Sequence, residues 1–253
     1  MSATYLPFAV APQDLEAAIN GLRALGCLGV NVTMPHKEAI APFLDDLSGD
    51  ARAVGAVNTV QNLAGRLIGH NTDVDGFREF VVADAGIDMT GLRALILGSG
   101  GAARAVVRAL RELGATTLYI AARRKPVAEQ LLLLADDVPG RVVGWEAIPE
   151  LLGETDIIVN ATPVGMGGEN PLPGAPLSAQ HQVIDLIYDP PVTPLMEAAR
   201  QAGGQAWGGL GMLVHQAAGS FGIWTGLQPP METMSAAALR GLGARHRASS
   251  AGS

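Results

Sequence analysis

Lysine is scarce in this chain, and one of its two lysines stands where an amine could exchange a proton with a substrate. Lys37 ends the stretch Asn31-Val32-Thr33-Met34-Pro35-His36-Lys37, in which a predicted strand at 28–33 leads into a helix that Pro35 is expected to open. The positive end of a helix dipole disfavours an ammonium ion, so this position would favour the neutral amine and suit general acid–base catalysis. A surface lysine that happens to precede a helix is the alternative.

Amide and carboxylate side chains in three further stretches could bind a substrate with several hydroxyl groups. Asn58 lies in Ala56-Val57-Asn58-Thr59, Asp73 ends Gly69-His70-Asn71-Thr72-Asp73, and Gln216 follows the glycine-rich stretch 208–211. Such groups supply both donors and acceptors, and an aspartate beside a lysine would also hold its ammonium in place. Taken singly, Asn58 and Asp73 are equally well explained as turn or helix-cap residues.

The stretch Gly98-Ser99-Gly100-Gly101-Ala102-Ala103 has the G-x-G-x-x-A spacing of a dinucleotide-binding turn. Gly98 permits a sharp turn, Gly100 lets the backbone approach a pyrophosphate, and the small Ala103 lets the helix pack on the strand. The pyrophosphate would accept hydrogen bonds from free N–H groups at the helix start. A strand predicted at 92–97 and a helix predicted to residue 113 give the turn the context this mechanism requires. An ordinary glycine-rich turn is the alternative.

The residues after the next predicted strand, 117–121, indicate which dinucleotide is bound. An NAD-binding protein places an acidic residue there, on the ribose 2′-hydroxyl. This chain has Arg123-Arg124-Lys125 instead, and guanidinium groups can bind a 2′-phosphate bidentately. We therefore expect NADP rather than NAD. A solvated basic turn is the alternative.

The composition limits the class of protein. The chain has 253 residues, 48% of them hydrophobic, and a net charge of −7, so it can bury a large core but suits neither nucleic acid nor an anionic membrane. Its single cysteine, Cys27, argues against an internal disulfide or a cysteine-based zinc site, and we expect no metal. Neither a signal-peptide pattern nor an uncharged apolar run of about 18 residues occurs, so a cytoplasmic protein is expected.

Short β-branched runs alternate with longer amphipathic stretches, a pattern typical of an α/β fold with parallel strands. The predicted strands span residues 5–10, 28–33, 56–61, 66–69, 92–97, 117–121, 157–160 and 182–186. The predicted helices span 13–25, 73–85, the stretch from the glycine turn to 113, 126–134, 193–201, 211–227 and 231–242. The series from 92 to 207 predicts a Rossmann domain, and the last two helices are expected to pack back on the first domain.

Together these stretches resemble the shikimate dehydrogenase family over nearly the whole chain. The matches to the family's motifs fall in its order and spacing: 31–37 (NVTxPxK), 56–59 (AVNT), 71–73 (NTD), the turn 98–103, 160–162 and 209–216. The resemblance implies reversible reduction of 3-dehydroshikimate to shikimate with NADPH, a step in the biosynthesis of chorismate and the aromatic amino acids.

The resemblance also implies roles for the candidate substrate-site residues. Lys37 would be the catalytic acid and base, with Asp73 as its partner. Three side chains would hold the ring hydroxyl groups: Asn58, Asp73 and Gln216. Thr33 and Tyr188 would line the same pocket.

For the cofactor, the resemblance implies that Leu186 and Gly209 border the nicotinamide. Arg123 matches the arginine of the family's N-R-T turn. A second family arginine falls near Val127, which leaves two basic residues as its substitutes, Arg124 and Lys125.

The implied architecture has two α/β domains: a substrate-binding domain of residues 1–72 with 210–253, and a Rossmann NADP-binding domain of residues 73–209. A monomer or a homodimer would fit the family. The family opens with a strand and an SxS loop that binds the substrate carboxylate, whereas this sequence starts at the family's second strand. Two alternatives follow: a paralogue acting on quinate or an aminoshikimate, or a non-catalytic NADP-binding protein that lacks the two serines.

Overall fold

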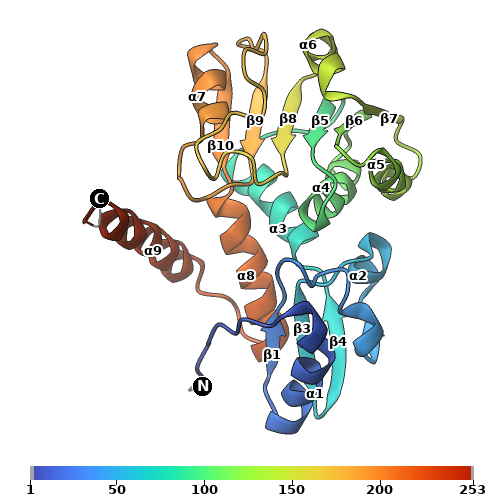
Figure 1. Cartoon of the computed structure of the whole chain (residues 1–253), viewed down its shortest axis with the longest axis vertical. Helices are drawn as coiled ribbons and strands as arrows, with labels where there is room; N and C mark the ends of the chain where they lie inside the picture. The colour runs from blue at the N-terminus through green and yellow to red at the C-terminus, as the bar shows by residue number, and fades with distance from the viewer. Residues whose placement is uncertain (1–2, 252–253) are drawn as a thin grey trace. The chain divides into compact units, whose positions relative to one another are not determined.

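The computed structural model of the chain describes residues 3–251, which fall into two compact units, Met1–Asn71 and Thr72–Ser253 (Figure 1). Each unit combines helices with one sheet, so the predicted α/β class is confirmed. Among the described residues, no helix is both long enough and apolar enough to cross a membrane.

A four-stranded sheet forms the centre of the first unit, with the strand order β1-β3-β4-β2. The strands are β1 (Gly29–Asn31), β2 (Asp46–Leu47), β3 (Thr59–Leu63) and β4 (Arg66–His70). β3 and β4 form the antiparallel pair that the sequence predicts. Ala64 and Gly65 connect them with φ angles of 52° and 93°, the pair of positive values that matches the twist of a two-residue hairpin.

Helix α1 (Leu15–Leu25) covers this sheet and confirms the amphipathic helix predicted at 13–25. Its Leu15 and Ile19 join a buried cluster with Val60 of β3 and Leu67 of β4. The unit also contains three short helices: η1 (Pro12–Asp14), η2 (Ala41–Phe43) and α2 (Gly49–Val54). The sequence analysis did not predict α2 or the short strand β2, although Ser48 caps α2 by accepting a hydrogen bond from the Ala51 amide at 3.2 Å.

The strand predicted at residues 5–10 is wrong. The segment lies outside the strands of the sheet, and Tyr5 and Phe8 are 70% and 73% exposed. A β-strand needs a neighbouring strand to satisfy its N–H and C=O groups, and alternating apolar residues cannot supply one. Tyr5 is instead connected to β1 through its hydroxyl group, which donates to Oδ1 of Asn31 at 3.0 Å.

The helix expected to begin at Pro35 is also wrong, because residues 34–40 form turns. The Val57 amide donates to the carbonyl oxygen of Lys37 at 2.7 Å. In a helix that carbonyl would accept from the amide four residues further on. The dipole argument for Lys37 therefore has no basis in this structure, and its acid–base role depends on the family resemblance.

The second unit is built on a six-stranded parallel sheet with the order β10-β9-β8-β5-β6-β7. The strands are β5 (Arg93–Leu97), β6 (Thr117–Ala121), β7 (Gly140–Val143), β8 (Ile157–Asn160), β9 (Gln182–Asp185) and β10 (Gln205–Gly208). The chain moves outward from β5 to β7, then returns beside β5 and continues to β10. This is the doubly wound Rossmann order, with its switch point between β5 and β8. The predicted Rossmann fold is confirmed, and the two edge strands, β7 and β10, were not predicted.

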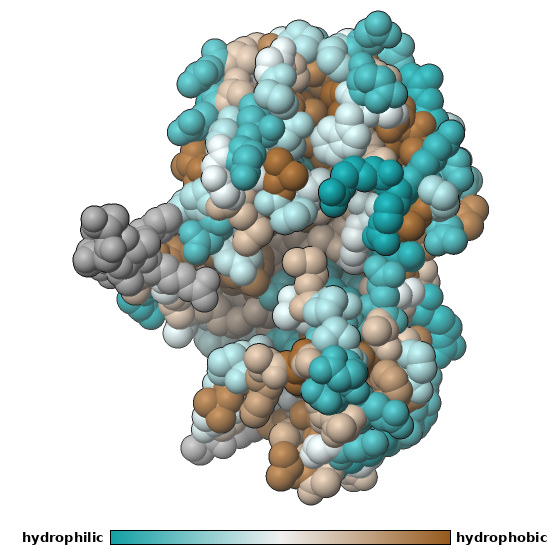
Figure 2. All heavy atoms as spheres, viewed as in Figure 1, coloured by the Kyte–Doolittle hydropathy of each residue, from teal (hydrophilic) through white to brown (hydrophobic). Residues whose placement is uncertain are grey.

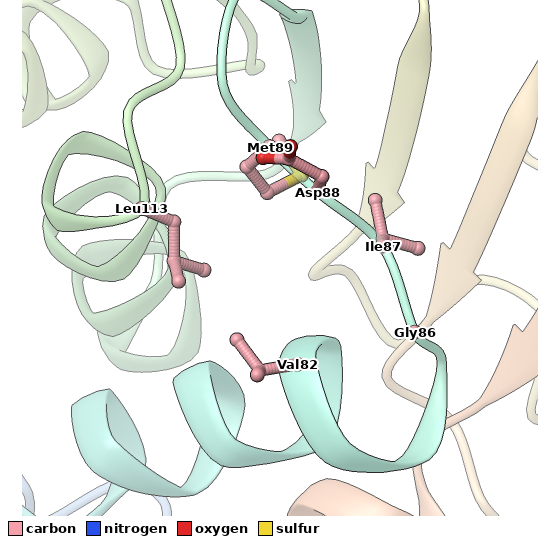
Figure 3. A pocket seen from close by; sticks show the side chains of 6 residues that line it. All are labelled: Val82, Gly86, Ile87, Asp88, Met89 and Leu113. Carbon is pink, nitrogen blue, oxygen red and sulfur yellow. The ribbon is translucent and has the colours of Figure 1, made fainter.

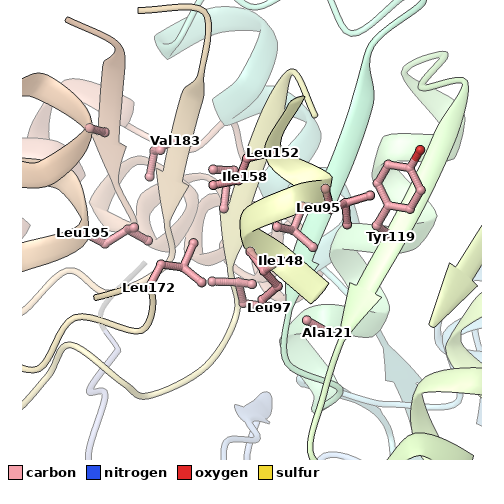
Figure 4. Packing of buried hydrophobic residues seen from close by; sticks show 12 residues of the cluster. Leu95, Leu97, Tyr119, Ala121, Ile148, Leu152, Ile158, Leu172, Val183 and Leu195 are labelled. Carbon is pink, nitrogen blue, oxygen red and sulfur yellow. The ribbon is translucent and has the colours of Figure 1, made fainter. Parts of the chain in front are cut away.

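The apolar residues of the central strands form the core of this unit (Figure 4). Leu95 and Leu97 of β5 pack with Ile158 of β8, Val183 of β9 and Leu152. Every residue of β8 is buried, as expected for a parallel strand covered on both faces. The core thereby fixes the carboxyl ends of the strands, where the candidate site residues lie.

The predicted helices of the second unit are present. Its helices are α3 (Asp73–Glu79), α4 (Gly101–Glu112), α5 (Lys125–Leu132), α6 (Ile148–Leu151), α7 (Pro194–Gln201), α8 (Leu210–Thr225) and α9 (Met231–Ala251). However, α6 was not predicted, and α9 continues to residue 251 instead of ending at 242. A π-helical turn, η3 (Phe80–Asp84), continues α3, and three 3-10 turns complete the set: η4 (Leu133–Ala135), η5 (Trp145–Ala147) and η6 (Leu152–Glu154). In the structure α8 packs against α3 and α9, within the compact unit of the Rossmann sheet. The assignment of α8 and α9 to a substrate-binding domain stays a prediction.

Candidate active site

The glycine-rich turn connects β5 to α4. Gly98 has a φ of 106°, and a Cβ there would lie 3.0 Å from Cγ2 of Thr162, so glycine is required. Gly100 caps α4, and a Cβ at that position would meet nothing within 4 Å, so the helix start faces open space. Ser99, Gly101 and Ala102 are partly exposed around it, whereas Ala103, in the first turn of α4, is buried. Amides at a helix start lack acceptors within the helix, and the turn therefore fits the pyrophosphate of a dinucleotide.

Three cations follow the neighbouring strand β6: Arg123, Arg124 and Lys125. The amide of Gly98 donates to the carbonyl oxygen of Ala121 at 2.8 Å, so this basic loop and the glycine turn leave the sheet side by side. The cations are exposed, and Figure 2 shows hydrophilic side chains over α5, which begins there. No carboxylate forms an ion pair with them in the part of the chain that the structure describes. Their charges are thus available to a phosphate group.

The loops after β9 and β10 bring Leu186 and Gly209 into contact. The amide of Gly209 donates to the carbonyl oxygen of Ile187 at 2.9 Å, and a Cβ on Gly209 would overlap the carbonyl oxygen of Leu186. Tyr188 lies two residues after Leu186 and helps to line a pocket with Trp207 at the end of β10. The predicted nicotinamide neighbours and the predicted pocket tyrosine therefore share one corner of the second unit.

A buried polar network joins the ends of β8 and β9. Oδ1 of Asp185 accepts from Nδ2 of Asn160 at 3.0 Å and from the Ile187 amide at 3.1 Å, and Oδ2 accepts from Oγ1 of Thr193 at 2.7 Å. Burial raises the pKa of Asp185, and these hydrogen bonds oppose that shift. In the sequence, Asn160 stands out only as part of the motif at 160–162, and Asp185 was not predicted. An acid that ends a buried apolar strand was the available signal.

In the first unit, Thr33, Lys37 and Asn58 lie on two neighbouring stretches. The amide of Val32 donates to the carbonyl oxygen of Asn58 at 2.7 Å, and that of Val57 donates to the carbonyl oxygen of Lys37 at 2.7 Å. Asn58 is buried, Lys37 is partly exposed and Thr33 is exposed. These backbone bonds fix a predicted proton donor beside a predicted substrate amide.

In the second unit, Asp73 and Gln216 lie on two helices that approach closely. Asp73 is buried at the start of α3, and a Cβ on Gly76, one turn further, would lie 2.8 Å from the Gln216 amide nitrogen on α8. Oγ1 of Thr72 lies 3.3 Å from Oγ of Ser220, which extends the contact by one turn. Gly76 lets the helices approach, so the structure brings these two predicted substrate ligands to one helix pair.

A separate pocket is lined mainly by apolar side chains between η3 and the end of α4 (Figure 3). Met89 precedes β5 and Leu113 precedes β6, so this pocket lies at the amino ends of the strands. Cofactors in this fold bind outside the carboxyl ends. The pocket is therefore not part of the candidate active site.

Family models match most of the chain in three segments. The shikimate dehydrogenase substrate binding domain matches residues 1–60, shikimate / quinate 5-dehydrogenase matches residues 81–165, and the shikimate 5′-dehydrogenase C-terminal domain matches residues 209–239.

Individual proteins give the same result. The chain is 44% identical over 252 residues to shikimate dehydrogenase (NADP(+)) of Symbiobacterium thermophilum, which covers 96% of this chain and 85% of the relative. It is 43% identical over 235 residues to the enzyme of that name from Geobacter metallireducens, covering 89% of this chain and 82% of the relative.

Solved structures extend the comparison to the fold. The shikimate 5-dehydrogenase of Thermus thermophilus in complex with NADP(H) and shikimate matches with a TM-score of 0.81 and 37% identity, over 91% of this chain and 85% of that one. A quinate dehydrogenase from Corynebacterium glutamicum in complex with NAD matches with a TM-score of 0.79 and 32% identity, over 91% and 84%. The resemblance inferred from the motifs is confirmed, and the chain belongs to the shikimate dehydrogenase family.

Proposed function

We propose that this protein reduces 3-dehydroshikimate reversibly to shikimate with NADPH, a step toward chorismate and the aromatic amino acids. The observation that carries the proposal is the pair of adjacent loops after β5 and β6. One loop holds a glycine turn with open space at a helix start, and the other holds exposed cations and no carboxylate. The first suits a pyrophosphate and the second a ribose 2′-phosphate. The names of the curated relatives support the same cofactor and substrate.

When bound, NADPH supplies the hydride that reduces the substrate ketone. Lys37 donates a proton to the ketone oxygen as it becomes a hydroxyl group, and removes that proton in the reverse direction. Asp73 acts as the partner of Lys37, because a nearby carboxylate holds an ammonium group in place. Leu186 and Gly209 would border the nicotinamide of the bound cofactor.

Substrate recognition is assigned to groups that can exchange hydrogen bonds with ring hydroxyls. These are the side chains of Asn58, Asp73 and Gln216. Thr33 and Tyr188 are the further candidates for contact with the substrate. Arg123 would bind the 2′-phosphate, with Arg124 and Lys125 as the neighbouring cations.

Replacement of each of the two lysines tests the chemical assignment. Lys37→Ala is expected to lower kcat about 10²–10⁴-fold while calorimetric NADP binding stays unchanged, because only the proton donor is lost. Lys125→Ala is the matched control, and it is expected to raise the KM for NADP without a comparable loss of kcat. Wild-type protein that binds NADP but forms no NADPH with shikimate would contradict the proposal and favour the non-catalytic alternative.

A quinate or aminoshikimate dehydrogenase is the second candidate, and the likeness to the quinate dehydrogenase of Corynebacterium glutamicum favours testing it. The values of kcat/KM for shikimate, quinate and an aminoshikimate, each with NADP and with NAD, separate the candidates. We expect shikimate with NADP to give the highest value. A higher value for quinate with NAD would replace the proposal.

We also expect a monomer or homodimer that works in the cytoplasm on a small-molecule substrate. The lone thiol of Cys27 suits a reducing compartment, and the net charge of −7 suits neither nucleic acid nor an anionic membrane. Light scattering on the purified protein measures its oligomeric state.

A further inference from the structure

Asp185 is a fully buried acid that the proposed reaction does not use. Its three recorded donors are uncharged and come from three places: the Asn160 side chain, the Ile187 backbone and the Thr193 hydroxyl group. Burial of a carboxyl group without a cationic partner opposes folding. An apolar residue would avoid this desolvation of a carboxyl group but would leave these three donors without an acceptor and could not join them.

On one side of Asp185, the amide of Asn160 holds the loop that follows β8. Its Nδ2 also donates to the carbonyl oxygen of Val164 at 3.0 Å, and its Oδ1 accepts from the Thr162 amide and hydroxyl at 3.1 and 2.7 Å. This loop lies against the glycine turn, because a Cβ on Gly98 would lie 3.1 Å from the carbonyl oxygen of Ala161. Asp185 is therefore linked to the glycine-rich turn through a single side chain, that of Asn160.

On the other side, Asp185 binds both ends of the loop that follows β9. The Ile187 amide donates to it near the start of that loop, and Thr193 donates to it at the end. Thr193 also caps α7 by accepting from the Met196 amide at 3.3 Å. The carbonyl oxygen of Ile187 in turn accepts from Gly209 at 2.9 Å. One carboxyl group thus fixes the loop that carries Leu186 and supports Gly209.

We propose that Asp185 is a positioning residue for hydride transfer, which holds the loops 161–164 and 186–193 in the arrangement that the nicotinamide requires. This inference rests on the proposed function, because that function places Leu186 and Gly209 beside the nicotinamide. Asp185 itself would touch neither substrate nor cofactor. It acts through the loops that it joins.

Asparagine at position 185 is the most informative replacement, because it keeps the size of the side chain and loses one acceptor. With its NH₂ in the place of Oδ1, it would face two donors, Asn160 and Ile187. With its NH₂ in the place of Oδ2, it would face the Thr193 hydroxyl, which would have to turn its proton away. The first orientation breaks the links to Asn160 and Ile187, and the second leaves the Thr193 hydroxyl proton without its acceptor, in neither case opening a cavity.

Steady-state kinetics of Asp185→Asn, measured below its unfolding temperature, test the inference. We expect kcat to fall on the order of 100-fold while the KM values for NADP and shikimate change less than about threefold, because misplacement affects the transition state more than binding. The kinetic isotope effect with NADPH deuterated at the transferred hydrogen should increase, since hydride transfer becomes more rate-limiting.

Matched variants separate positioning from stability. Asp156→Asn changes an aspartate at the amino end of the adjacent strand, and it should leave kcat unchanged. Thr193→Val should reproduce part of the kcat loss, and Thr193→Ser should restore it, because serine keeps the hydroxyl group that donates to Asp185. Thr193→Val and Thr193→Ser remain informative if Asp185→Asn fails to fold.

Amide hydrogen exchange gives a readout that does not depend on turnover. The Ile187 and Thr162 amides should exchange faster in Asp185→Asn, whereas amides of β5 and β6 should not change. Unchanged kcat in folded Asp185→Asn, or equal kcat in Thr193→Val and Thr193→Ser, would overturn the inference. A wild-type protein without shikimate turnover would contradict the proposed function instead, and the exchange rates would still show whether Asp185 holds the loops.

Discussion

The two ends of the six-stranded sheet each hold an aspartate, and their surroundings are opposite. Asp156, before β8 at the amino end, accepts from Nε and an NH2 group of Arg93 at 2.9 and 2.8 Å and is partly exposed. Arg93 lowers the pKa of Asp156. Asp185, at the carboxyl end of β9, is fully buried among uncharged donors, and burial raises its pKa.

We infer from this difference that the two ends of the sheet contribute differently to stability and to function. At the amino end, the ion pair between Arg93 and Asp156 and the hydrogen bond from the Arg93 amide connect β5 to β8. The desolvation cost of this pair is low, since water still reaches both charged groups. At the carboxyl end, where ligands bind in this fold, the protein buries an acid and thereby defines two loops. The predictions below test whether the two ends have these separate roles.

The largest expected effect on stability is that of Asp185→Ala. Removal of the carboxyl group leaves three buried donors without their acceptor, and each such loss costs about 1–3 kcal/mol, so the free energy of unfolding should fall by roughly 3 kcal/mol or more. Urea unfolding followed by circular dichroism measures this change. A loss below that of Asp156→Ala would contradict the proposed difference between the two ends.

The next effect concerns the cations at the carboxyl end of β6. The double replacement Arg123→Ala with Arg124→Ala should lower kcat/KM for NADP about 10²–10⁴-fold, because each charge-assisted hydrogen bond to phosphate contributes roughly 1.5–3 kcal/mol and the two arginines are lost together. The value for NAD should barely change. Arg52→Ala, which removes an exposed arginine paired with Asp46 in the first unit, is the control. Equal losses for both dinucleotides would mean that these residues do not read the 2′-phosphate.

A smaller effect is expected at the amino end. Asp156→Asn should lower the free energy of unfolding by about 1 kcal/mol, because the Arg93 side chain is 38% exposed and solvent screens the pair. The kcat at saturating substrates should equal that of the wild type. Thermal unfolding and initial rates on the same preparation measure the two quantities, and a large fall in kcat would remove the distinction between the ends.

The smallest effect is a difference in pH dependence, and its sign is opposite for the two acids. The stabilisation by Asp156 is present above the ordinary carboxyl pKa of 3.8 and is lost as the pH falls through its lowered pKa. For Asp185, with its raised pKa, stability falls as the pH rises from 3.8 through that pKa.

Urea unfolding of the wild type and of both Asn variants across acidic pH tests these signs. The stability advantage of the wild type over Asp156→Asn should grow with pH, whereas its advantage over Asp185→Asn should shrink. Parallel trends for the two variants would show that the carboxyl groups are not in opposite surroundings.

The accuracy of sequence-based prediction differed between the two units. In the second unit, β6 and β8 begin and end where the apolar runs predicted, because buried parallel strands are continuously apolar. The edge strands β7 and β10 were missed, since half-exposed strands such as Gly140–Val143 contain polar residues and glycine. In the first unit, the strand predicted at 5–10 and the helix predicted to begin at Pro35 were wrong. Both depend on which backbone groups pair with these segments, and the local residue pattern does not contain that information.

The sequence alone predicted the family, the Rossmann fold and the glycine-rich turn at 98–103, because those depend on residue types at fixed local spacing. It also named the candidates Lys37, Asn58, Asp73 and Gln216 through the same motifs. Only the tertiary structure showed that Asp185, Asn160 and Thr193 form one buried network, because parallel strands bring residues that are distant in sequence to one edge of the sheet. Whether a polar side chain is a cap, a surface residue or a link between loops depends on such neighbours, and local sequence does not contain them.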